Sequence, residues 1–562
     1  MVRSHQCEVS HSKHNEKQNA NNSTQLASRC FALLGAGGGW HDIAGAFTNK
    51  GKHHIFQGQG WNHAVSEDLV HWTEGGMGPK ALNETYHGMQ STDTPCSGYV
   101  VRGDDDLVCA GFRQCGSNSG VDELPNDWDV PMEVRCAHDQ ENLTDFSEDP
   151  TDGLYDFIFP VSFWRGIPYD PARPWFDEST NMWYHLIAMD GCNSTDVPRN
   201  TPDGKVCPSG GALYMWSSPA LRGAEADWQP LGNVFQDNTT VLKDYGFLSH
   251  EFVTIDFFGT MEGDPSPAKD TAFVFLNNVG GNGGGDGCCG GTTAYTILSQ
   301  PGGPGTEFEY LEAGPGQQMV DWGSFKFRDT LENMKTWKVT DPTEYLDGSS
   351  TRGFSMARTL GSEESNQVTK EGRRVLIGWT GNPPFFDDYA GSLQSLPREL
   401  SLADDYQLKQ KFVDELQTLR GEEKKGKVSV GTSAVEVLAT FPSSCGEAGA
   451  DCGLEVLADG DASLVLRLNY EDMGLITLDG TTLGNAELRA GPLPKELQGG
   501  GGWSVSVIVD HSIVEIIVNE LTAFVLYVMP EESNAGEVRL WGGDGAEGEF
   551  TTWELQNANV AN

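Results

Sequence analysis

The chain of 562 residues is longer than one hydrophobic core needs, so we expect two domains. Its 81 Asp and Glu against 37 Lys and Arg give a formal charge of −44, which repels phosphate backbones and anionic lipids and so excludes nucleic acid and membranes as partners. No apolar run approaches the roughly 20 residues of a membrane-spanning helix, and 69 Gly with 27 Pro favour an all-β, turn-rich chain.

The N-terminal segment 1–32 is polar and rich in Asn, Ser, His and Lys, and we expect it to be a mobile leader. A secretory signal needs an uninterrupted apolar segment of about 7–15 residues. The leader offers only Phe31-Ala32-Leu33-Leu34 at its end. The sequence therefore contains no clear signal peptide.

The cysteines nevertheless favour an oxidising compartment. They are even in number, with no C-x-x-C pair and no histidine at zinc-finger spacing, so disulfides are expected rather than zinc. Three short separations would close small loops: Cys109 to Cys115, Cys192 to Cys207, and Cys445 to Cys452. Glycosylation sequons point the same way and occur at Asn22, Asn83, Asn142, Asn193 and Asn238. We expect a secreted or vacuolar, disulfide-bonded glycoprotein.

The stretch from Trp40 to Trp72 is predicted to end a strand, turn at glycine and return as a short alternating strand, closed by a turn over residues 66–69. It places Asp42 beside Trp40 at the mouth of a β element. An aromatic ring covers the C–H face of a sugar, and a carboxylate stabilises positive charge at the anomeric carbon. This pairing is typical of a sugar-cleaving pocket; the plain alternative is that Asp42 is a turn residue.

Short β-like runs then recur between turn residues, without amphipathic helices between them. They cover residues 53–57, 182–188, 212–216, 272–277 and 373–379. This pattern favours a propeller or a large barrel over a doubly wound sheet.

A connector is predicted next. Leu408, Phe412, Leu416 and Leu419 fall at helical spacing and predict one short helix, followed by a charged turn over residues 421–427. We place the domain boundary there, with a first domain over 33–420 and a second over 421–562.

The second domain has period-two patterning throughout. Its alternating runs cover residues 463–468, 475–478, 503–509, 513–518, 523–528, 537–541 and 550–555. Strands joined by short turns in this way predict an antiparallel sandwich. Asp510 and Glu515 lie at odd separation and are expected on opposite faces, as surface or interface residues.

Two further carboxylates lie in settings like that of Asp42. Asp170 lies between Pro168 and Pro171, which stiffen the backbone at a strand mouth. Glu251 precedes an aromatic-rich segment, which would desolvate it and raise its pKa. A general acid working near neutral pH needs such a raised pKa.

Seven blocks of sequence follow one another in a recognisable order. They are Trp40–Gly45, Trp61–Trp72, Tyr169-Asp170-Pro171, His250-Glu251 with Asp256-Phe257-Phe258, Gly372–Trp379, Leu396–Leu400 and Val509–Asn519. Together they resemble glycoside hydrolase family 32, the invertase, inulinase and fructosyltransferase group. The resemblance runs from about Gly35 to Leu555.

The resemblance implies a five-bladed β-propeller followed by a C-terminal antiparallel β-sandwich, with the three carboxylates in the central funnel. Position by position, it implies that Asp42 is the nucleophile, Asp170 the transition-state stabiliser and Glu251 the acid/base. A retaining enzyme of this kind places acid and nucleophile roughly 5–5.5 Å apart and forms a covalent glycosyl-enzyme.

Further substrate-binding candidates are Trp40, Gln57, Trp61, Ser97 and Trp322. Gln57 lies one residue out of register with the glutamine that the family supplies from the strand after the nucleophile. Core packing explains Trp61 and Trp322 equally well.

Three departures from the family pattern bear on substrate preference. His41-Asp42-Ile43-Ala44 stands for Asn-Asp-Pro-Asn, Tyr169 for an arginine and Phe252 for a cysteine. Losing the arginine removes a bidentate donor beside the stabiliser. Arg173 and Arg165 are the candidates to supply the missing charge.

The predicted function is a retaining hydrolase that releases β-linked fructose from sucrose or fructans. The alternatives are a fructosyltransferase, a furanosidase for another five-membered sugar, and a non-catalytic carbohydrate-binding homologue. No metal or cofactor is implied, because carboxylates and water suffice for the chemistry. The expected partner is a sugar substrate. Whether a second copy of the chain forms a homo-oligomer with it is left open.

Overall fold

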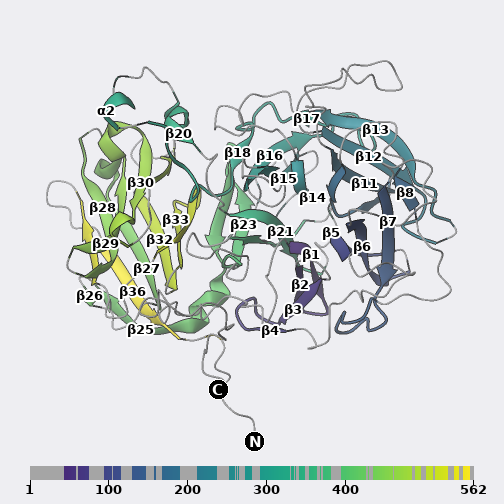
Figure 1. Cartoon of the computed structure of the whole chain (residues 1–562), viewed down its shortest axis with the longest axis horizontal. Coiled ribbons are helices and arrows are strands. Elements are labelled where there is room, and N and C mark those ends of the chain that lie inside the picture. The colour runs from purple at the N-terminus through teal and green to yellow at the C-terminus, as the bar shows by residue number, and fades with distance from the viewer. Residues whose placement is uncertain are drawn as a thin grey trace, which may run out of the picture. The chain divides into compact units, whose positions relative to one another are not determined.

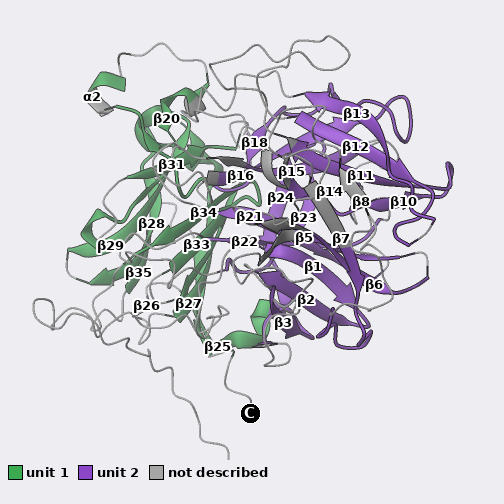
Figure 2. Ribbon diagram, turned by 45° about the vertical axis from the view of Figure 1, so that its right-hand side comes forward, with its two compact units in different colours: residues 1–36, 322–347, 416–562 green, residues 37–321, 348–415 purple. Residues whose placement is uncertain are grey.

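The computed structural model describes most of both predicted domains. The described residues are 43–57, 61–74, 94–103, 105–115, 130–146, 157–159, 168–189, 212–223, 225–236, 252–259, 261, 264, 272–280, 291–329, 331–334, 336, 341–347, 354–363, 368, 371–380, 394–425, 428–429, 434–447, 449–459, 461–483, 488–494, 502–510, 513–528, 537–542, 549–556 and 558. The chain divides into two compact units (Figure 2): unit 1 comprises 1–36, 322–347 and 416–562, and unit 2 comprises 37–321 and 348–415.

Within its described residues, unit 2 contains five antiparallel sheets that follow one another along the chain (Figure 1). The first holds β1 (Ile43–Asn49), β2 (Lys52–Gln57), β3 (Asn62–Ser66) and β4 (Trp72–Glu74), and the second β5 (Thr94–Arg102), β6 (Val108–Cys115), β7 (Val130–Cys136) and β8 (Phe157–Phe159). The third holds β9 (Pro168–Pro171), β10 (Trp175–Asp177), β11 (Met182–Met189), β12 (Ala212–Ser218) and β13 (Gln229–Gln236).

The fourth sheet holds β14 (Phe252–Phe258), β15 (Ala272–Gly280), β16 (Gly291–Ser299), β17 (Glu309–Tyr310) and β18 (Gln318–Met319). The fifth holds β21 (Ser355–Gly361), β22 (Arg374–Trp379), β23 (Arg398–Leu402) and β24 (Leu408–Phe412). The five predicted runs of the first domain fall on β2, β11, β12, β15 and β22, so these strand predictions are confirmed.

The strands that open the five sheets, β1, β5, β9, β14 and β21, are here called the first strands. Each contacts two others: β1 contacts β5 and β21, β9 contacts β5 and β14, and β14 contacts β21. The first strands are therefore neighbours in a closed cyclic order, although hydrogen-bonded ladders run only within each sheet.

Apolar clusters fill the space between consecutive sheets. One joins the first and second sheets through Phe47, Phe56 and Phe112, and another joins the second and third through Tyr99 and Trp183. A third cluster joins the third and fourth sheets through residues that include Trp175, Met215, Phe257 and Phe275. Because sheets cover both faces, β1, β12, β21 and β22 are buried along their whole length, which explains their runs of apolar residues in place of alternation.

The predicted connector helix is wrong in its first half. Residues Leu408–Phe412 form β24, which pairs with β23, and only Asp414–Leu419 coils, as a 3-10 helix. Lys409 and Lys411 alternate with the buried Leu408 and Gln410. This period of two competes with the helical spacing of the leucines, and pairing with β23 decides in favour of the strand.

The part of unit 1 that the structure describes forms two antiparallel sheets. The first has the order β20 (Leu346–Asp347), β19 (Lys326–Phe327), β31 (Arg489–Pro492), β30 (Leu475–Asp479), β29 (Ala462–Leu468), β28 (Cys452–Asp459), β35 (Glu537–Trp541) and β26 (Val428–Ser429). The second has the order β25 (Arg420–Lys425), β36 (Glu549–Leu555), β27 (Ala434–Phe441), β32 (Trp503–Asp510), β33 (Ile513–Val518) and β34 (Thr522–Tyr527). Each of the seven predicted runs falls on a strand.

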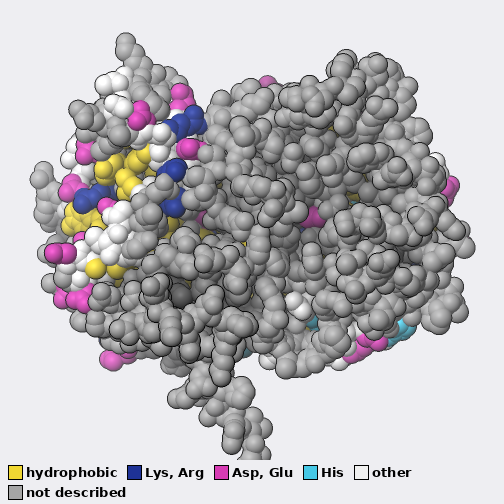
Figure 3. All heavy atoms as spheres, viewed as in Figure 1, with side chains coloured by type: hydrophobic (Ala, Val, Ile, Leu, Met, Phe, Trp, Pro, Cys, Tyr) yellow, Lys and Arg dark blue, Asp and Glu magenta, His cyan; other side chains and the backbone are white. Residues whose placement is uncertain are grey.

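The strands of the larger sheet alternate between buried and partly exposed residues, as along β29. Charged side chains of both signs and apolar side chains are mixed over the visible part of this unit (Figure 3). Short helical segments, α2 (Leu331–Met334) among them, lie between strands. No helix among the described residues is long and apolar enough to cross a bilayer.

Two predictions for the second domain are wrong. The charged segment expected as a turn forms β25, an edge strand paired with β36. Asp510 and Glu515 are both buried, and they lie on the adjacent strands β32 and β33, where Asp510 faces Ile513 and Glu515 faces Ile508. Cross-strand partners share a face, so the two carboxylates point to the same side of the sheet.

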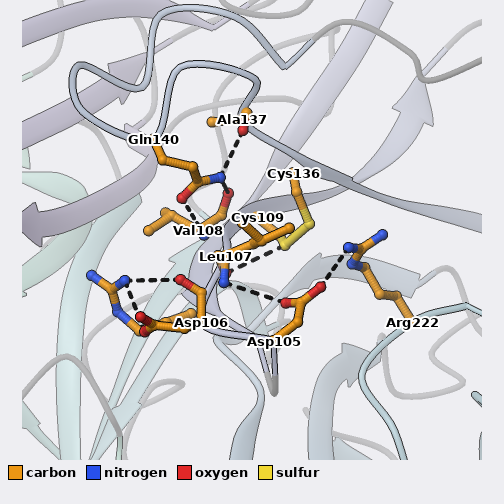
Figure 4. Close-up of a disulfide and its surroundings, with 10 residues drawn as sticks. Asp105, Asp106, Leu107, Val108, Cys109, Cys136, Ala137, Gln140 and Arg222 are labelled. Carbon is orange, nitrogen blue, oxygen red and sulfur yellow. Dashed lines mark hydrogen bonds and ion pairs between the residues drawn. A yellow bond between two sulfur atoms is a disulfide. The ribbon is translucent and has the colours of Figure 1, made fainter.

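The disulfides confirm one predicted loop and correct another. Cys445 is bonded to Cys452, as predicted. Cys109 is bonded to Cys136, its register partner on β7, and not to Cys115 (Figure 4). Cys109 and Cys115 lie on the same strand, where a rise of about 3.4 Å per residue separates them by roughly 20 Å, beyond the reach of a disulfide. Cys192 and Cys207 lie outside the described residues.

Candidate functional site

A β-bulge interrupts the start of every first strand. The register shifts fall between Ile43 and Gly45 in β1, Pro95 and Gly98 in β5, Phe252 and Ile255 in β14, Ser355 and Arg358 in β21, and across β9 where it pairs with β11. Bulges redirect side chains and are frequent beside active sites. Ser97 and Asp170 lie within two of these bulges, and the bulges of β1 and β14 begin at Ile43 and Phe252, the residues that follow Asp42 and Glu251 in the sequence.

The structure describes some of the predicted site residues. Asp170 lies in β9 and is buried, with 5% of its surface exposed. Ser97 belongs to β5. Asp42, Glu251 and Trp40 lie outside the described residues, so their predicted roles stay predictions.

One arginine of β21 contacts three other first strands. The Nε of Arg358 donates to the carbonyl oxygen of Ile43 (3.4 Å), and its Nη2 donates to those of Gly98 (3.0 Å) and Pro171 (3.3 Å). Arg358 is buried. These three carbonyl groups belong to the residues directly after Asp42, Ser97 and Asp170.

Arg358 belongs to a buried charged cluster, here called the arginine cluster, made of Arg173, Arg358, Arg374 and Asp256. Asp256 accepts hydrogen bonds from the N–H (2.7 Å) and hydroxyl (2.6 Å) of Thr359. Burial lowers the pKa of Arg374 to about 9, with the charge of Arg173 as a second cause and Asp256 opposing both. The ring of Phe258 lies 5.2 Å from the Arg374 guanidinium.

Arg173 was one candidate for the charge beside Asp170, and one of its two terminal nitrogens bonds backbone carbonyl groups of β1 and β21. Its Nη2 donates to the carbonyl oxygens of Ala46 (2.6 Å) and Thr359 (3.2 Å), which joins β1 to β21. Burial lowers its pKa, Asp256 raises it and Arg358 lowers it further. Arg165 lies outside the described residues. The guanidinium bonded to the residue after Asp170 is that of Arg358.

Gln57 is a buried amide whose register partner, Ile43, follows the predicted nucleophile in the sequence. It ends β2 and pairs with Ile43 across the sheet. It is 0% exposed, and neither its Oε1 nor its Nε2 has a hydrogen-bond partner among the described residues. Buried polar atoms are nearly always hydrogen-bonded, so this amide is a candidate to bind a ligand or a water molecule.

The two tryptophans with alternative explanations are interior residues. Trp61 is 0% exposed and packs with Phe56 and Phe112 in the cluster between the first two sheets. Trp322 belongs to unit 1, where it is 2% exposed and lies 4.7 Å from the Phe325 ring, centroid to centroid. Both have the environment that core packing predicts.

Sequence reasoning missed Arg358. It lies in Phe354-Ser355-Met356-Ala357-Arg358-Thr359-Leu360, a β-like run with a single charged residue. That charge in an otherwise uncharged buried run is the signal that could have identified it. Its partners are backbone carbonyl groups, so the residue types of the partners do not reveal these contacts in the sequence.

Residues 404–560 match the family model described as Glycosyl hydrolases family 32 C terminal. The predicted resemblance to glycoside hydrolase family 32 is thereby confirmed. No curated protein matches the chain at a significant level.

Solved structures of that group share the fold. Exo-inulinase from Aspergillus awamori matches with a TM-score of 0.65 at 16% identity, over 94% of this chain and 98% of that chain. Fructan 1-exohydrolase IIa from Cichorium intybus matches with a TM-score of 0.62 at 17% identity, over 94% and 98%. A fructosyltransferase from A. japonicus matches with a TM-score of 0.64 at 14% identity, over 95% and 96%. At these identities the likeness concerns the fold: all-β, with a propeller and a sandwich in the similar proteins.

Proposed function

We propose that the protein is a retaining glycosidase that releases β-linked fructose from sucrose or a fructan. The observation that carries the proposal is the meeting of first strands at Arg358, which is bonded to the residues directly after Asp42, Ser97 and Asp170. Residues that neighbour a common guanidinium start from the same small region, as a nucleophile and a transition-state stabiliser that act on one sugar require.

In this proposal Glu251 protonates the glycosidic oxygen while Asp42 attacks the anomeric carbon. The aglycone leaves, a covalent fructosyl-enzyme forms on Asp42, and Glu251 then deprotonates the water that releases fructose. Asp170 accepts hydrogen bonds from the sugar hydroxyl groups. Asp42 must be ionised to attack, and the arginine cluster supplies positive charge beside Ile43, which favours a carboxylate anion nearby.

The cyclic contacts of the first strands support a five-bladed propeller for unit 2. The five sheets follow one another in chain order, and the first strand of each contacts the first strands of two other sheets. In a propeller, sheets repeat around a central axis in this way. We propose that the candidate carboxylates lie at one end of that centre.

The similar structures support fructosides as the substrate class. They are named as an exo-inulinase and a fructan exohydrolase, and a further one is a Bombyx mori beta-fructofuranosidase in complex with sucrose. A fructosyltransferase is equally similar in fold, so the acceptor, water or a second sugar, has to be determined from products.

We also propose an oxidising, extracellular or vacuolar site of action. The bonds Cys109–Cys136 and Cys445–Cys452 support it, because disulfides persist in such compartments. Asn142, in the one sequon that the described residues include, is exposed in a turn. A mass shift of the Asn142 peptide on enzymatic deglycosylation of the native protein is expected, and an unmodified peptide with free thiols would contradict the proposal.

Product analysis tests the function. Chromatography of digests with sucrose and inulin, each at low and high concentration, should show free fructose with wild type. Fructose oligomers in excess over fructose at high sucrose would indicate a transferase, and binding of a fructan without any product would indicate a non-catalytic homologue.

Glu251→Gln, Asp42→Asn and Asp170→Asn should each lose turnover by about 10³-fold or more while keeping the wild-type melting temperature. Gln318→Glu, in the short strand β18, is the control. It makes the reverse exchange, from an amide to a carboxylate, and should retain activity. Full activity of all three carboxylate variants would exclude the proposed roles.

A further inference from the structure

Arg358 makes contacts that a side chain serving only as core filling would not need. Its hydrogen bonds go to three carbonyl groups on three different first strands, β1, β5 and β9. A guanidinium is planar and carries five N–H donors in fixed directions. Three acceptors bonded to one such group are fixed relative to one another in distance and direction.

Hydrogen bonds fix the backbone on both sides of Arg358. Before it, the N–H of Met356 donates to Oδ1 of Asn278 in β15 (3.2 Å), and Met356, which lies within the bulge, has a positive φ of 51°. After it, Thr359 donates twice to Asp256 of β14. Arg358 is therefore held from the fourth sheet while it reaches the first three.

The carbonyl groups that Arg358 binds lie in the bulges or at their edges. Ile43 and Gly98 are themselves residues at which the register shifts, and Pro171 ends β9. A bulged backbone lacks part of its ladder, so its direction depends on other contacts. Each of these carbonyl groups belongs to the peptide that follows Ile43, Gly98 or Pro171, so the φ and ψ of one residue separate the held peptide from Asp42, Ser97 or Asp170.

We propose that Arg358 is a positioning residue that holds the starts of β1, β5 and β9 in fixed positions relative to one another and thereby sets the spacing of Asp42 and Asp170. The three bonds described go to backbone carbonyl groups, so through them Arg358 acts on the residues that it orients. The catalytic consequence rests on the proposed function, whereas the holding of the three strands does not.

The central experiment compares Arg358→Lys with Arg398→Lys. Both arginines belong to the fifth sheet and are buried. Arg398 binds Oδ2 of Asp321 at 3.1 Å, with both side chains 0% exposed, and bonds no first-strand carbonyl group among the contacts described. An ammonium group replaces each guanidinium, so both variants lose donor geometry while keeping charge.

Misplacement of a reacting group by about 1 Å costs on the order of 10²-fold in rate. Arg358→Lys should therefore lower kcat by about 100-fold with KM changed by less than about threefold, whereas Arg398→Lys should lower the melting temperature and leave kcat within about threefold of wild type. A fall in kcat that is no larger for Arg358→Lys than for Arg398→Lys overturns the catalytic part of the proposal.

Hydrogen–deuterium exchange tests the holding of strands without turnover. Arg358→Lys should speed exchange in peptides that cover residues 43–47, 98–102 and 168–172 together, and Arg398→Lys should not. Unchanged exchange in these peptides overturns the proposal. If wild type releases no fructose, the proposed function fails and the exchange comparison still decides the role of Arg358. If Arg358→Lys does not fold, Arg358→Gln, which buries no ammonium group, gives the same comparison.

Discussion

Asp256 of β14 accepts two hydrogen bonds from Thr359 of β21, one from the N–H at 2.7 Å and one from the hydroxyl at 2.6 Å. Both residues are buried, and Asp256 also faces the charges of Arg173 and Arg374. A buried carboxylate is stable only when hydrogen bonds and opposite charges compensate its lost hydration. Thr359 thus joins two first strands and satisfies the acidic member of the arginine cluster.

Thr359→Val should lower the free energy of unfolding by about 2 kcal/mol, because it removes one hydrogen bond to a charged group and keeps the shape of the side chain. Denaturant titration followed by fluorescence measures the change. Thr73→Val is the matched control, since Thr73 is exposed in β4 and donates to Val65 over 3.3 Å. Equal effects of the two substitutions would contradict the role given to Thr359.

Gln57→Leu should raise the melting temperature and lower kcat/KM for a fructoside. The substitution removes a buried amide whose two polar atoms lack partners among the described residues, a burden of about 1–3 kcal/mol, and it also removes a donor and an acceptor for a bound sugar. A gain in stability together with a loss of activity is what a buried binding residue predicts.

Gln140→Leu is the control for this prediction. The Gln140 amide bonds the N–H of Val108 (2.8 Å) and the carbonyl oxygen of Ala137 (2.6 Å) beside the Cys109–Cys136 disulfide (Figure 4). Its replacement should lower the melting temperature and leave kcat unchanged. A Gln57→Leu variant that loses stability as Gln140→Leu does would show that the Gln57 amide makes structural hydrogen bonds and is not a binding residue.

Two buried histidines predict a loss of stability in mild acid. Burial lowers the pKa of His54 to about 3, helped by the neighbouring His63, and burial lowers the pKa of His185 to about 3 against the opposing bond to Ala172. In the unfolded chain both titrate near 6.5. Between pH 6.5 and 3 the unfolded state therefore binds more protons, so stability is fully present above pH 6.5 and falls as the pH drops, by up to about 1.4 kcal/mol per pH unit for each histidine.

Melting temperatures between pH 7.5 and 4.5 test this dependence. His185→Gln keeps a donor for the Ala172 carbonyl oxygen and cannot titrate, so its curve should be flatter than that of wild type. His138→Gln, at an exposed position, should leave the slope unchanged. A slope that is the same in wild type and His185→Gln would contradict the assignment.

The two disulfides within the described ranges should differ in their contribution to stability. With sequence separations of 27 for Cys109–Cys136 and 7 for Cys445–Cys452, loop entropy gives about 3.5 and 2.4 kcal/mol respectively. Paired Cys→Ala variants of each bond, unfolded by denaturant, measure both values. A larger loss for the shorter loop would show that native-state effects outweigh chain entropy.

Much of the secondary structure follows from local pattern. The alternation of residues 463–468 predicts β29, because a sheet with one covered face imposes that period, whereas the run of residues 513–518 is buried along its whole length as β33. Pattern fails where two periods compete, as at Leu408–Phe412, which became β24. It also fails where register decides, as in the pairing of Cys109 with Cys136.

The candidate site divides in the same way. Asp170 was predicted from the prolines that flank it, and Gln57 from the resemblance to the family alone. Arg358 could not be predicted, since it binds carbonyl groups, and every residue of the chain carries one. Its role depends on three strands distant in sequence that meet in space.

The most direct measurement is peptide mapping of Glu251→Gln after incubation with an activated β-fructofuranoside. Without the acid/base, the good leaving group still departs but hydrolysis of the intermediate is slow, so the covalent sugar accumulates. The account predicts one added hexosyl residue on the peptide that contains Asp42. An unmodified Asp42 peptide, or an adduct on another carboxylate, would contradict it.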